Sequence, residues 1–456
     1  MARETPPGEA PGEQGKHVQA GRFGRALKLG GLATRVAGSA FANAVGKAFG
    51  PSTPEAATDA AAQALMQNAE RIVQVMGEMK GAVMKVGQLI SADPDLVVPE
   101  FADSLSKLQR SAPPMPFEMV RAQVEGQLGD TLEALYADFE TAPIGAASIG
   151  QVHRARLHDG RVVAVKVQYP GIADTLESDL KNLGMVLNVG RVLLAKERLE
   201  GFLEEAKVAI LDEADYELEA RTLQRFRKLF ADKPALRIPE PVLGHTARQV
   251  LTMEFIEGEK LDDALRRIDD PAVRDQIVTN FVDAFVSMFH DQHVLHADPH
   301  PGNFMLDAQG RIVLLDFGCT RAFDPALCDG ILDLLMAFWD DDMAEMERLF
   351  RALGFGEPGV KYPDAEVLRT YHRIVLEPLM HDGPFDFAGW SVHGRLRTFM
   401  RDHLEMLRLP PPPGLLLYLR VLAGIKGQMA RMQANVNVRQ IAEACCRRHG
   451  RLPAGV

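Results

Sequence analysis

Residues 148–170 constrain the fold most, because they contain two strand-like runs on either side of a turn. Their sequence is SIGQVHRARLHDGRVVAVKVQYP, and the runs meet at Asp159-Gly160. An Asp-Gly pair between such runs is a strong hairpin signal, since glycine accepts the positive φ that tight hairpin turns require. We therefore predict an antiparallel β-hairpin. With helical patterns around it, the chain falls into the α+β class.

Those helical patterns lie on both sides of the hairpin. Before it, Ser52 and Glu55 form a capping box that opens a pattern to about residue 90, and FADSLSKLQ and PFEMVRAQVEGQLG give two shorter ones. After it, residues 200–230 and DQIVTNFVDAFVSMFHDQH are helical in pattern, whereas RQVLTMEFIEG is strand-like. A second hairpin, NFMLDAQGRIVLLDFG, is predicted to turn at Gln309-Gly310. From about Asp324 onward we expect helices, interrupted only by LPPPPG.

The composition excludes several classes of protein. Of 456 residues, 46% are hydrophobic and 25% are charged, as in soluble globular proteins. The net charge of -11 argues against nucleic acid as the main partner, because phosphate binding draws on excess Lys and Arg. The four cysteines form neither a CxxC pair nor a spaced disulfide framework, which favours a reducing compartment.

No apolar run reaches the roughly 20 residues of a membrane span. The nearest, GLLLYLRVLAGI, carries Arg420 and is predicted to form a buried helix. The N-terminal MARETPPGEAPGEQG is predicted to be a disordered tail rather than a secretory signal. Between Glu13 and Glu55 there are basic and apolar residues but no acid, so this arm either lies on an anionic membrane surface or packs on its own acidic protein. We predict a cytoplasmic protein without a transmembrane helix, peripheral at a membrane if the arm binds one.

The first hairpin begins with the spacing of a phosphate-binding glycine loop. In GAASIGQV, Gly145, Gly150 and Val152 match the pattern G-x-G-x-x-G-x-V, while Ala147 stands where the middle glycine belongs. Across the hairpin, VAVK ends in Lys166. This position corresponds to the strand lysine that contacts nucleotide phosphates and a helix glutamate.

The loop HADPHPGNF supplies the reacting groups. His296, Asp298 and Asn303 reproduce H-x-D followed five residues on by N, and LLDFG then gives Asp316. Asp298 would hold the attacking hydroxyl or water, whereas Asn303 and Asp316 would hold magnesium. Triphosphate chemistry requires such oxygen ligands, a lysine on the phosphates and an acid at the nucleophile. The four motifs in this order predict a phosphoryl-transfer site.

Two other kinds of site compete for these residues. His290, His293 and His296 recur every third residue, as zinc ligands sometimes do, but no cysteine or fourth ligand stands near them in the sequence. We therefore interpret His290 and His293 as packing or surface residues. AASIG around Ser148 imitates the nucleophile elbow of hydrolases, which requires a strand before the serine and a helix after it. A strand-rich hairpin follows instead, which disfavours a hydrolase.

Three features distinguish the chain from ordinary protein kinases. Ala297 replaces the arginine of H-R-D, so no basic residue stands there to receive a phosphorylated activation loop. Only CTRAFD separates Gly318 from the helical pattern near Pro325, and no A-P-E motif follows, which leaves little room to dock a protein substrate. Ala147 carries a Cβ where glycine would permit positive φ and close approach to phosphate.

Two further signatures lie outside these motifs. MKVGQ contains K-x-G-Q as Lys85, Gly87 and Gln88, and DEADYELEA contains E-x-D as Glu213 and Asp215. Together with the alanine-rich loop GAASIGQVH, they resemble the UbiB-like atypical kinases, also called aarF-domain or ADCK-type proteins, over about residues 66–430. The resemblance implies a helix that carries K-x-G-Q and lies across the site where a protein kinase takes its peptide.

The resemblance also implies specific contacts. Lys166 should pair with Glu219, and Lys85 with Glu213. On a regular helix of about 100° per residue, Asp215 and Glu219 lie on nearly one face and can share a site, whereas Glu213 points elsewhere. Taken alone, these acids would be interpreted as a solvated helix face, and Lys85 as an exposed lysine.

We therefore predict an α+β chain with a two-lobed protein-kinase-like fold, a helical N-terminal extension covering the cleft and extra C-terminal helices. Residues 1–50 would form the disordered, basic amphipathic arm and 51–135 the helical extension. Residues 136–258 would form the kinase-like N-lobe, and 259–456 the helical C-lobe with the catalytic loop. The predicted ligands are ATP or ADP and Mg²⁺.

The site residues fall into three predicted groups. The catalytic group comprises Lys85, Gln88, Lys166, Glu213, Asp215, Glu219 and Asp298. The nucleotide-binding group comprises Gly145, Ala146, Ala147, Ser148, Gly150, Val152, Ala164, Lys166, Met253, Glu254 and Ile256. The metal ligands are Asn303 and Asp316. Within the second group, Ala164 would leave room for the adenine ring.

The predicted function is that of an ATP-dependent phosphotransferase or ATPase. The resemblance implies that it supports isoprenoid-quinone (ubiquinone) biosynthesis through ATP-dependent handling of lipid precursors. Further partners would be an anionic membrane surface and other quinone-biosynthesis proteins, with no nucleic acid. Two alternatives stay open: a conventional protein kinase, and a nucleotide-gated lipid-binding scaffold without significant turnover.

Overall fold

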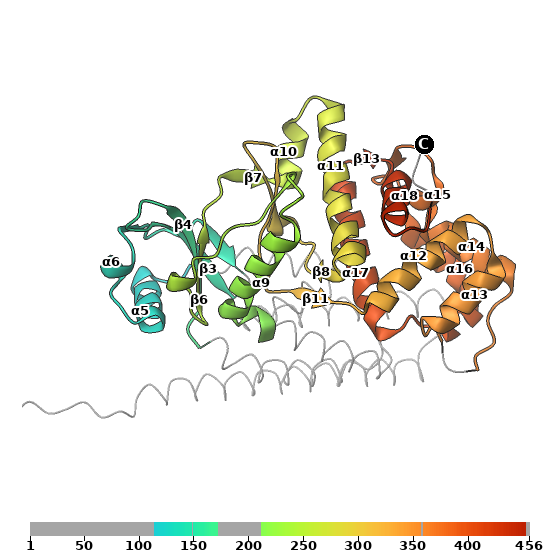
Figure 1. Cartoon of the computed structure of the whole chain (residues 1–456), viewed down its shortest axis with the longest axis horizontal. Coiled ribbons are helices and arrows are strands. Elements are labelled where there is room, and N and C mark those ends of the chain that lie inside the picture. The colour runs from blue at the N-terminus through green and yellow to red at the C-terminus, as the bar shows by residue number, and fades with distance from the viewer. Residues whose placement is uncertain (1–113, 148, 172–210, 357–358, 453–456) are drawn as a thin grey trace, which may run out of the picture. The chain divides into compact units, whose positions relative to one another are not determined.

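The computed structural model of the chain describes residues 114–147, 149–171, 211–356 and 359–452 (Figure 1). The chain divides into two compact units. The first comprises residues 1–120, 143–152 and 168–214, and the second comprises 121–142, 153–167 and 215–456. The basic arm, the capping box and the helical patterns predicted before residue 110 lie outside the described residues.

The described part of the first unit is built around the start of the first hairpin. Strand β2 (Gly145–Ala147) pairs antiparallel with the first residues of β3 (Gly150–Arg156), which places Ala147 opposite Gly150. Gln151 is buried, and its side-chain oxygen accepts the backbone N–H of Met115 at 2.8 Å. In the same unit, the buried Gln168 donates to the carbonyl of Ala214 at 2.9 Å.

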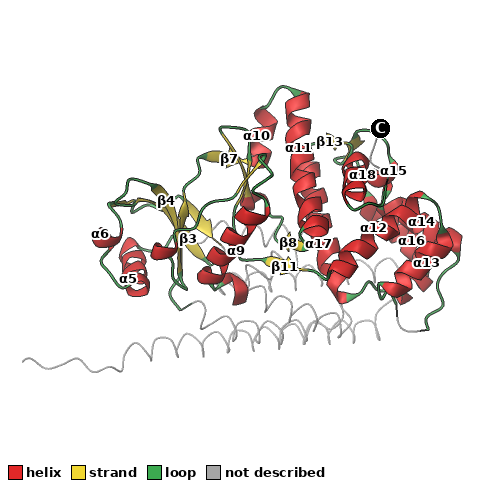
Figure 2. Ribbon diagram, viewed as in Figure 1, coloured by secondary structure: helices red, strands yellow, loops and turns green. Residues whose placement is uncertain are grey.

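A five-stranded sheet contains the predicted first hairpin (Figure 2). Strands β1 (Asp138–Phe139), β3, β4 (Val162–Gln168) and β6 (Val250–Glu254) follow one another in that order, and β2 is attached to β3. Gly160 turns the hairpin with φ +90°, a conformation that glycine adopts without steric cost. The alternating burial along β3 and the continuous burial along β4 explain why β-branched residues dominate the second strand. The first hairpin is confirmed.

Helix α9 (Tyr216–Leu229) packs beside this sheet through a stripe of buried residues at helical spacing. Helix α5 (Phe117–Leu128) confirms the pattern in PFEMVRAQVEGQLG. Further short elements are α6 (Leu132–Leu135), the 3₁₀ turn η1 (Leu243–His245) and α10 (Leu261–Arg267).

A second sheet contains the other predicted hairpin. Its strand order is β5 (Leu236–Arg237), β10 (Ile312–Leu314), β9 (Phe304–Asp307) and β7 (Gly258–Lys260). Strands β9 and β10 are antiparallel and turn at Gly310, which has φ +74°. Strand β8 (Val294–His296) pairs with β11 (Thr320–Ala322), which lies inside the CTRAFD stretch. Neither of these strands was predicted.

Helices make up most of the chain from residue 261 onward (Figure 1). They are α11 (Pro271–Val286) with the π-helical turn η2 (Ser287–Asp291), α12 (Pro325–Trp339), α13 (Met343–Ala352), α14 (Ala365–Val375), α15 (Glu377–Met380), α16 (Val392–Asp402), α17 (Pro413–Arg431) and α18 (Val438–Arg448), with 3₁₀ turns η3 (Pro301–Asn303) and η4 (Leu404–Arg408). Asp270, Asp324 and Asp342 cap α11, α12 and α13 by accepting a first-turn N–H within 3.0 Å.

Two expectations for this helical region are wrong. Strands β12 (Phe385–Asp386) and β13 (Asn435–Val436) pair with each other, so the region after Asp324 is not purely helical. Helix α17, predicted to be buried, is buried on one side only: Val421 and Ile425 are covered, whereas Leu419 and Leu422 are 38% and 40% exposed. Across the part of the chain that the structure describes, no helix combines the length and apolar character that crossing a membrane requires.

Candidate active site

Lys166 lies between two carboxylates in the second unit. Strand β4 carries Lys166, α9 carries Glu219, and Asp316 follows β10. The Lys166 Nζ is 3.0 Å from Glu219 Oε2 and 3.2 Å from Asp316 Oδ2. The side chains of Lys166 and Glu219 are 4% and 1% exposed, whereas that of Asp316 is 21% exposed. The contact that the resemblance implies between Lys166 and Glu219 is thus present, and Asp316 reaches the same ammonium.

Two aromatic residues hold this cluster in place. The ring of Tyr216 lies under the Lys166 ammonium, with the centroid 4.9 Å from Nζ. Phe317 donates its backbone N–H to Glu219 Oε1 at 3.2 Å, and its ring packs 4.9 Å from the ring of Phe226 on α9. Sequence reasoning missed both contacts, because neither follows from motif spacing.

Asp316 adopts an uncommon backbone conformation, with φ +56°. Aspartate tolerates this left-handed region better than most residues, since its short side chain can bond locally. Here Asp316 Oδ1 accepts the N–H of Gly318 at 3.3 Å. The other carboxylate oxygen is thereby directed at Lys166, at 3.2 Å.

The loop from Asp298 to Asn303 is folded tightly on itself. The carbonyl of Asp298 accepts the N–H of His300 at 2.7 Å and the Nδ2 of Asn303 at 3.0 Å. The Leu315 N–H bonds the carbonyl of Asn303 at 2.9 Å. His296 is fully buried, and its Nε2 donates to the Leu315 carbonyl at 3.1 Å. Leu315, the residue before Asp316, is therefore bonded to Asn303 at the end of the loop and to His296 just before its start.

These contacts decide which atoms are available to a metal. Asn303 is 9% exposed and uses its Nδ2 on the Asp298 carbonyl, so its side-chain oxygen is the atom left for a ligand. Asp316 adds carboxylate oxygens. Oxygen donors of this kind suit Mg²⁺, a hard cation. The donor set thus fits the predicted metal.

Most of the nucleotide-binding residues predicted in the second unit lie on the neighbouring strands β4 and β6, and Ile256 follows β6. Ala164 on β4 is paired in register with Met253 on β6, and both are buried, as is Ile256. The side chain of Glu254 forms an ion pair with Arg237 at 2.6 Å. Any contact of Glu254 with nucleotide would therefore come from its backbone.

The remaining predicted residues lie in the first unit or outside the described residues. In the loop, Gly145 and Ala146 are exposed and Gly150 is buried. Glu213 is 1% exposed. Lys85, Gln88 and Ser148 lie outside the described residues, and the predicted pairing of Lys85 with Glu213 lies there too. Val152 and Ala147 are half-buried.

The helical geometry expected for Asp215 is wrong. Residues 211–213 are helical, but the chain turns at Ala214, and α9 begins at Tyr216. Asp215 has extended backbone angles, and its side chain accepts the N–H of Leu218 at 2.9 Å. Asp215 therefore caps α9 rather than sharing a helix face with Glu219. An aspartate directly before the first residue of an amphipathic stripe, here Tyr216, is the signal from which this cap could have been predicted.

The three histidines spaced as zinc ligands do not form a metal site. The buried His290 is bonded to the carbonyl of Cys328 at 3.2 Å, and burial lowers its pKa to about 4. His296 bonds Leu315 instead, as described above. His293 has φ +52° and is half-buried in the turn between η2 and β8. His290 is thus a packing residue, as predicted.

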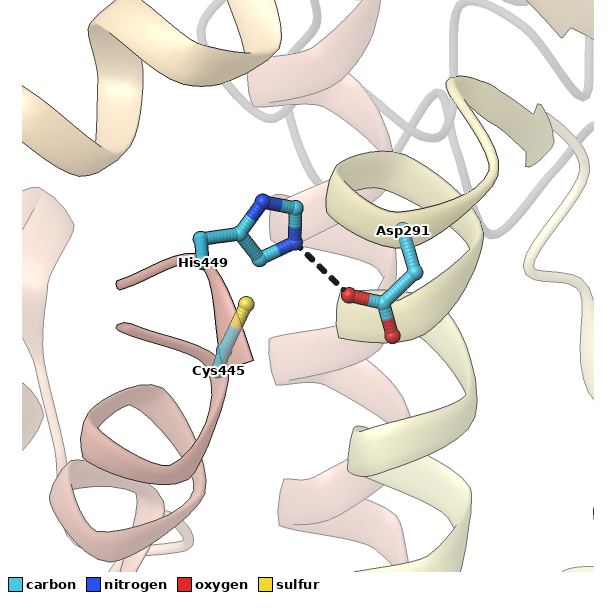
Figure 3. Close-up of side chains that lie close together, drawn as sticks. All are labelled: Asp291, Cys445 and His449. Carbon is cyan, nitrogen blue, oxygen red and sulfur yellow. Dashed lines mark hydrogen bonds and ion pairs between the residues drawn. The ribbon is translucent and has the colours of Figure 1, made fainter. Parts of the chain in front are cut away.

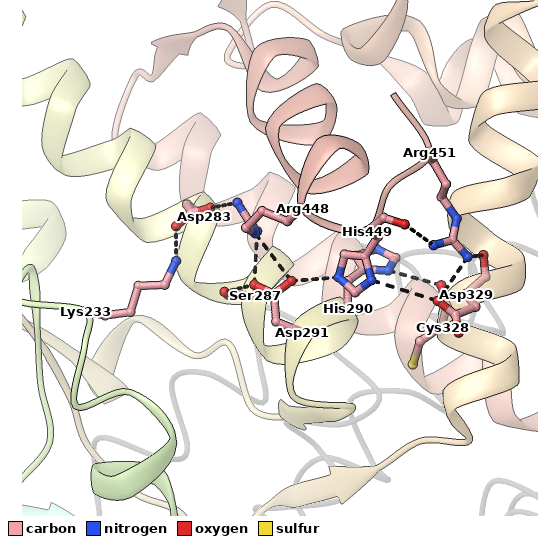
Figure 4. Close-up of polar contacts among 10 residues, drawn as sticks. All are labelled: Lys233, Asp283, Ser287, His290, Asp291, Cys328, Asp329, Arg448, His449 and Arg451. Atoms are coloured by element: carbon pink, nitrogen blue, oxygen red, sulfur yellow. Dashed lines mark hydrogen bonds and ion pairs between the residues drawn. The ribbon is translucent and has the colours of Figure 1, made fainter. Parts of the chain in front are cut away.

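Among the described residues, one other group brings metal-binding residue types together. Ligand atoms of Asp291, Cys445 and His449 lie within 4.8 Å of one another (Figure 3). Asp291 already accepts from Ser287, from His449 at 2.8 Å and from the Arg448 guanidinium at 3.1 Å (Figure 4). Burial raises the pKa of the Cys445 thiol to about 12, because a thiolate is poorly solvated there. We interpret this group as an ionic contact between α18 and η2.

Comparison with known proteins decides the family. A family model described as the ABC1 atypical kinase-like domain matches residues 107–350, more than half of the chain. The chain belongs to this family. The UbiB-like resemblance drawn from K-x-G-Q and the alanine-rich loop is thereby confirmed.

Individual members of the ABC1 family align over most of the chain. The atypical kinase COQ8B, mitochondrial, of Rattus norvegicus is 32% identical over 93% of this chain and 80% of that protein. The atypical kinase coq-8, mitochondrial, of Caenorhabditis elegans is also 32% identical, over 92% of this chain. The chain spans 56% of the length of the nematode protein.

A solved structure confirms the fold. This chain is similar to the chain in the structure titled the complex of Rv3197 with erythromycin from Mycobacterium tuberculosis, with a TM-score of 0.60 and 27% sequence identity. The match covers 85% of this chain and 97% of the chain in that structure. The chain has a two-lobed protein-kinase-like fold of the ABC1 type. The predicted extension over the cleft involves residues outside the described part.

Proposed function

We propose that this chain is an ATP-dependent phosphotransferase or ATPase that works with Mg²⁺. One observation carries the proposal: the Lys166 ammonium contacts both Glu219 and Asp316 in a nearly buried cluster. Burying an ion pair costs more free energy than apolar packing of the same volume. The retention of two carboxylates on one buried lysine supports a chemical use for the charge.

Each residue has a task in such a reaction. Lys166, held by Glu219, presents a fixed positive charge to the nucleotide phosphates. Asn303 and Asp316 would hold the metal, and Mg²⁺ would neutralise charge on the triphosphate oxygens. Asp298 orients the attacking hydroxyl or water and accepts its proton. The hydrogen bonds from His300 and Asn303 to the Asp298 carbonyl keep this acid in position.

The acceptor is proposed to be water or a small, lipid-like molecule rather than a protein. A protein kinase docks its peptide on a long segment after D-F-G. Here only CTRAFD separates Gly318 from α12, and Thr320–Ala322 of that stretch form β11 against β8. This geometry favours the small acceptor over a conventional protein kinase.

The biological role is proposed from the family resemblance. UbiB-like proteins suggest ATP-dependent handling of isoprenoid-quinone precursors, such as those of ubiquinone, at a membrane surface. Other quinone-biosynthesis proteins would be partners. A nucleotide-gated scaffold without turnover would use the same fold and the same ligands, and it differs from the enzyme only in what Asp298 does.

Replacing Asp298 by Asn separates these functions. We expect the purified wild-type chain to hydrolyse ATP, faster with anionic liposomes and quinone-precursor mimics. Asp298→Asn should lower turnover by about a hundredfold or more, because general base catalysis contributes that much, while nucleotide affinity stays nearly unchanged. Turnover that survives the substitution would contradict the proposed role of Asp298. Robust transfer of labelled phosphate to a generic protein would favour the protein-kinase alternative.

A further inference from the structure

Helix α17 contacts the loop that carries Asp298. Gln428 donates from Nε2 to the carbonyl of Pro299 at 2.8 Å, and its side chain is 3% exposed. Gly424, one helical turn earlier, lies against the proline ring: a Cβ built on it would be 2.3 Å from Pro299 Cγ and 3.2 Å from Pro299 Cβ. Residues four apart share a helix face, so both contacts come from one face of α17.

From this geometry we infer that Gly424 and Gln428 are positioning residues for the reaction: through Pro299 they fix the orientation of Asp298. The inference rests on the proposed function, because it assigns a role in the step that Asp298 performs. Neither residue belongs to the four motifs that predict the site. They lie more than a hundred residues after Asp298, in a C-terminal helix.

The loop needs such a support at Pro299. The Asp298 carbonyl is held from inside the loop by His300 and Asn303. Proline has no N–H and a φ that its ring fixes, so another segment can contact it only through its carbonyl and its ring. Gln428 holds the carbonyl and Gly424 receives the ring. Together they restrain Pro299, the residue that follows the catalytic acid.

The residue types argue against simple packing. Glycine destabilises a helix interior relative to alanine, and a buried amide must find partners or cost free energy. At position 428 an apolar side chain would pack without needing a hydrogen-bond partner, and at position 424 the Pro299 ring leaves no room for a Cβ. Gly427 on the same helix provides a contrast, because a Cβ there would meet only the end of Arg431, at 3.8 Å. The close approach is specific to Gly424.

The test compares Gly424→Ala with Gly427→Ala, using the full chain. We expect Gly424→Ala to lower kcat on the order of tenfold to a hundredfold, as small displacements of a reacting group do, with the KM for ATP within about twofold of wild type. Gly427→Ala should match wild type in both constants. Gln428→Glu, which keeps the shape but removes the donor, should repeat the kcat loss. It also serves as the second variant if Gly424→Ala does not fold.

A double variant tests whether the effect travels through Pro299. Pro299→Ala removes the ring atom closest to the new Cβ, so adding Gly424→Ala to Pro299→Ala should cost little further kcat. Full additivity of the two losses would overturn the inference. So would equal kcat values for Gly424→Ala, Gln428→Glu and wild type, or losses that appear in KM and melting temperature alone.

Wild type and Asp298→Asn are measured beside these variants. Turnover that depends on Asp298 but not on Gly424 or Gln428 overturns the inference and leaves the proposed function intact. A wild type no faster than Asp298→Asn overturns the proposed function, and the inference falls with it.

Discussion

At the Lys166 side chain, three ionisable groups share a volume from which water is largely excluded. Removing one of these groups destabilises the folded protein, because it leaves an uncompensated charge in a buried position. Glu219 is the more buried of the two acids, and it also accepts the Phe317 N–H. It therefore fixes both the lysine and the start of the segment after Asp316.

Glu219→Gln tests this arrangement. We expect the free energy of unfolding to fall by about 2 to 4 kcal/mol, because Lys166 loses its closest counter-charge in a buried position. Glu217→Gln on the same helix is the matched control. Glu217 faces Arg221 at 4.0 Å, both side chains are more than half exposed, and such surface pairs contribute little. Urea denaturation measures both variants, and equal losses would contradict the buried-pair interpretation.

At the scale of elements, the C-terminal end of α18 is tied to α11 and η2 by ionic contacts (Figure 4). Arg448 lies 3.7 Å from Asp283 and 3.1 Å from Asp291, and His449 bonds Asp291 at 2.8 Å. Burial acts to raise the pKa of Asp291, but the hydrogen bonds from Ser287 and His449 and the nearby Arg448 outweigh it. The pKa of Asp291 therefore lies below its ordinary value.

The lowered pKa of Asp291 determines how the effect of Asp291→Asn on the free energy of unfolding changes with pH. A carboxylate whose pKa falls on folding stabilises the folded state above its ordinary pKa, 3.8, and the contribution is lost as the pH falls through the folded-state value. We expect Asp291→Asn to lower the free energy of unfolding by about 1 to 2 kcal/mol at pH 7. The difference in free energy of unfolding between the variant and wild type should close below about pH 4. Asp329→Asn, at a more exposed partner of Arg451, should cost less. A gap that persists unchanged at pH 3 would contradict this account.

The elements that sequence reasoning predicted correctly are those whose signals are local. Gly160 and Gly310 indicate the two hairpins, because a turn with positive φ favours glycine whatever the two strands pack against. The pairs β8–β11 and β12–β13 gave no such signal, since strands of two or three residues exist only through a remote partner. The cap at Asp215 was misjudged because one continuous helix was assumed.

At the scale of the whole molecule, motif order predicted the family, and tertiary contacts supplied the rest of the site. Spacing placed Lys166, Asp298 and Asp316 on their strand and loops, which is why the phosphoryl-transfer interpretation could be made. Spacing could not place Tyr216 under Lys166 or Gln428 against Pro299, because these contacts arise from packing between distant segments. The net charge of -11 indicates which partners the chain can bind and carries no information about its fold.

We propose that Asn303, Asp316 and Lys166 together bind a magnesium-bound nucleotide. Isothermal titration of ADP into the purified chain, with Mg²⁺ and with EDTA, tests it on wild type and Asp316→Asn. Asparagine tolerates the φ of +56° at this position, so the variant should fold. We predict that ADP affinity falls roughly tenfold or more when Mg²⁺ is removed, and by a similar factor in Asp316→Asn. Each loss corresponds to about 1.4 kcal/mol or more of binding free energy. Removing Mg²⁺ from Asp316→Asn should lower the affinity little further. Affinity that ignores both Mg²⁺ and the substitution, or no binding at all, would contradict the account.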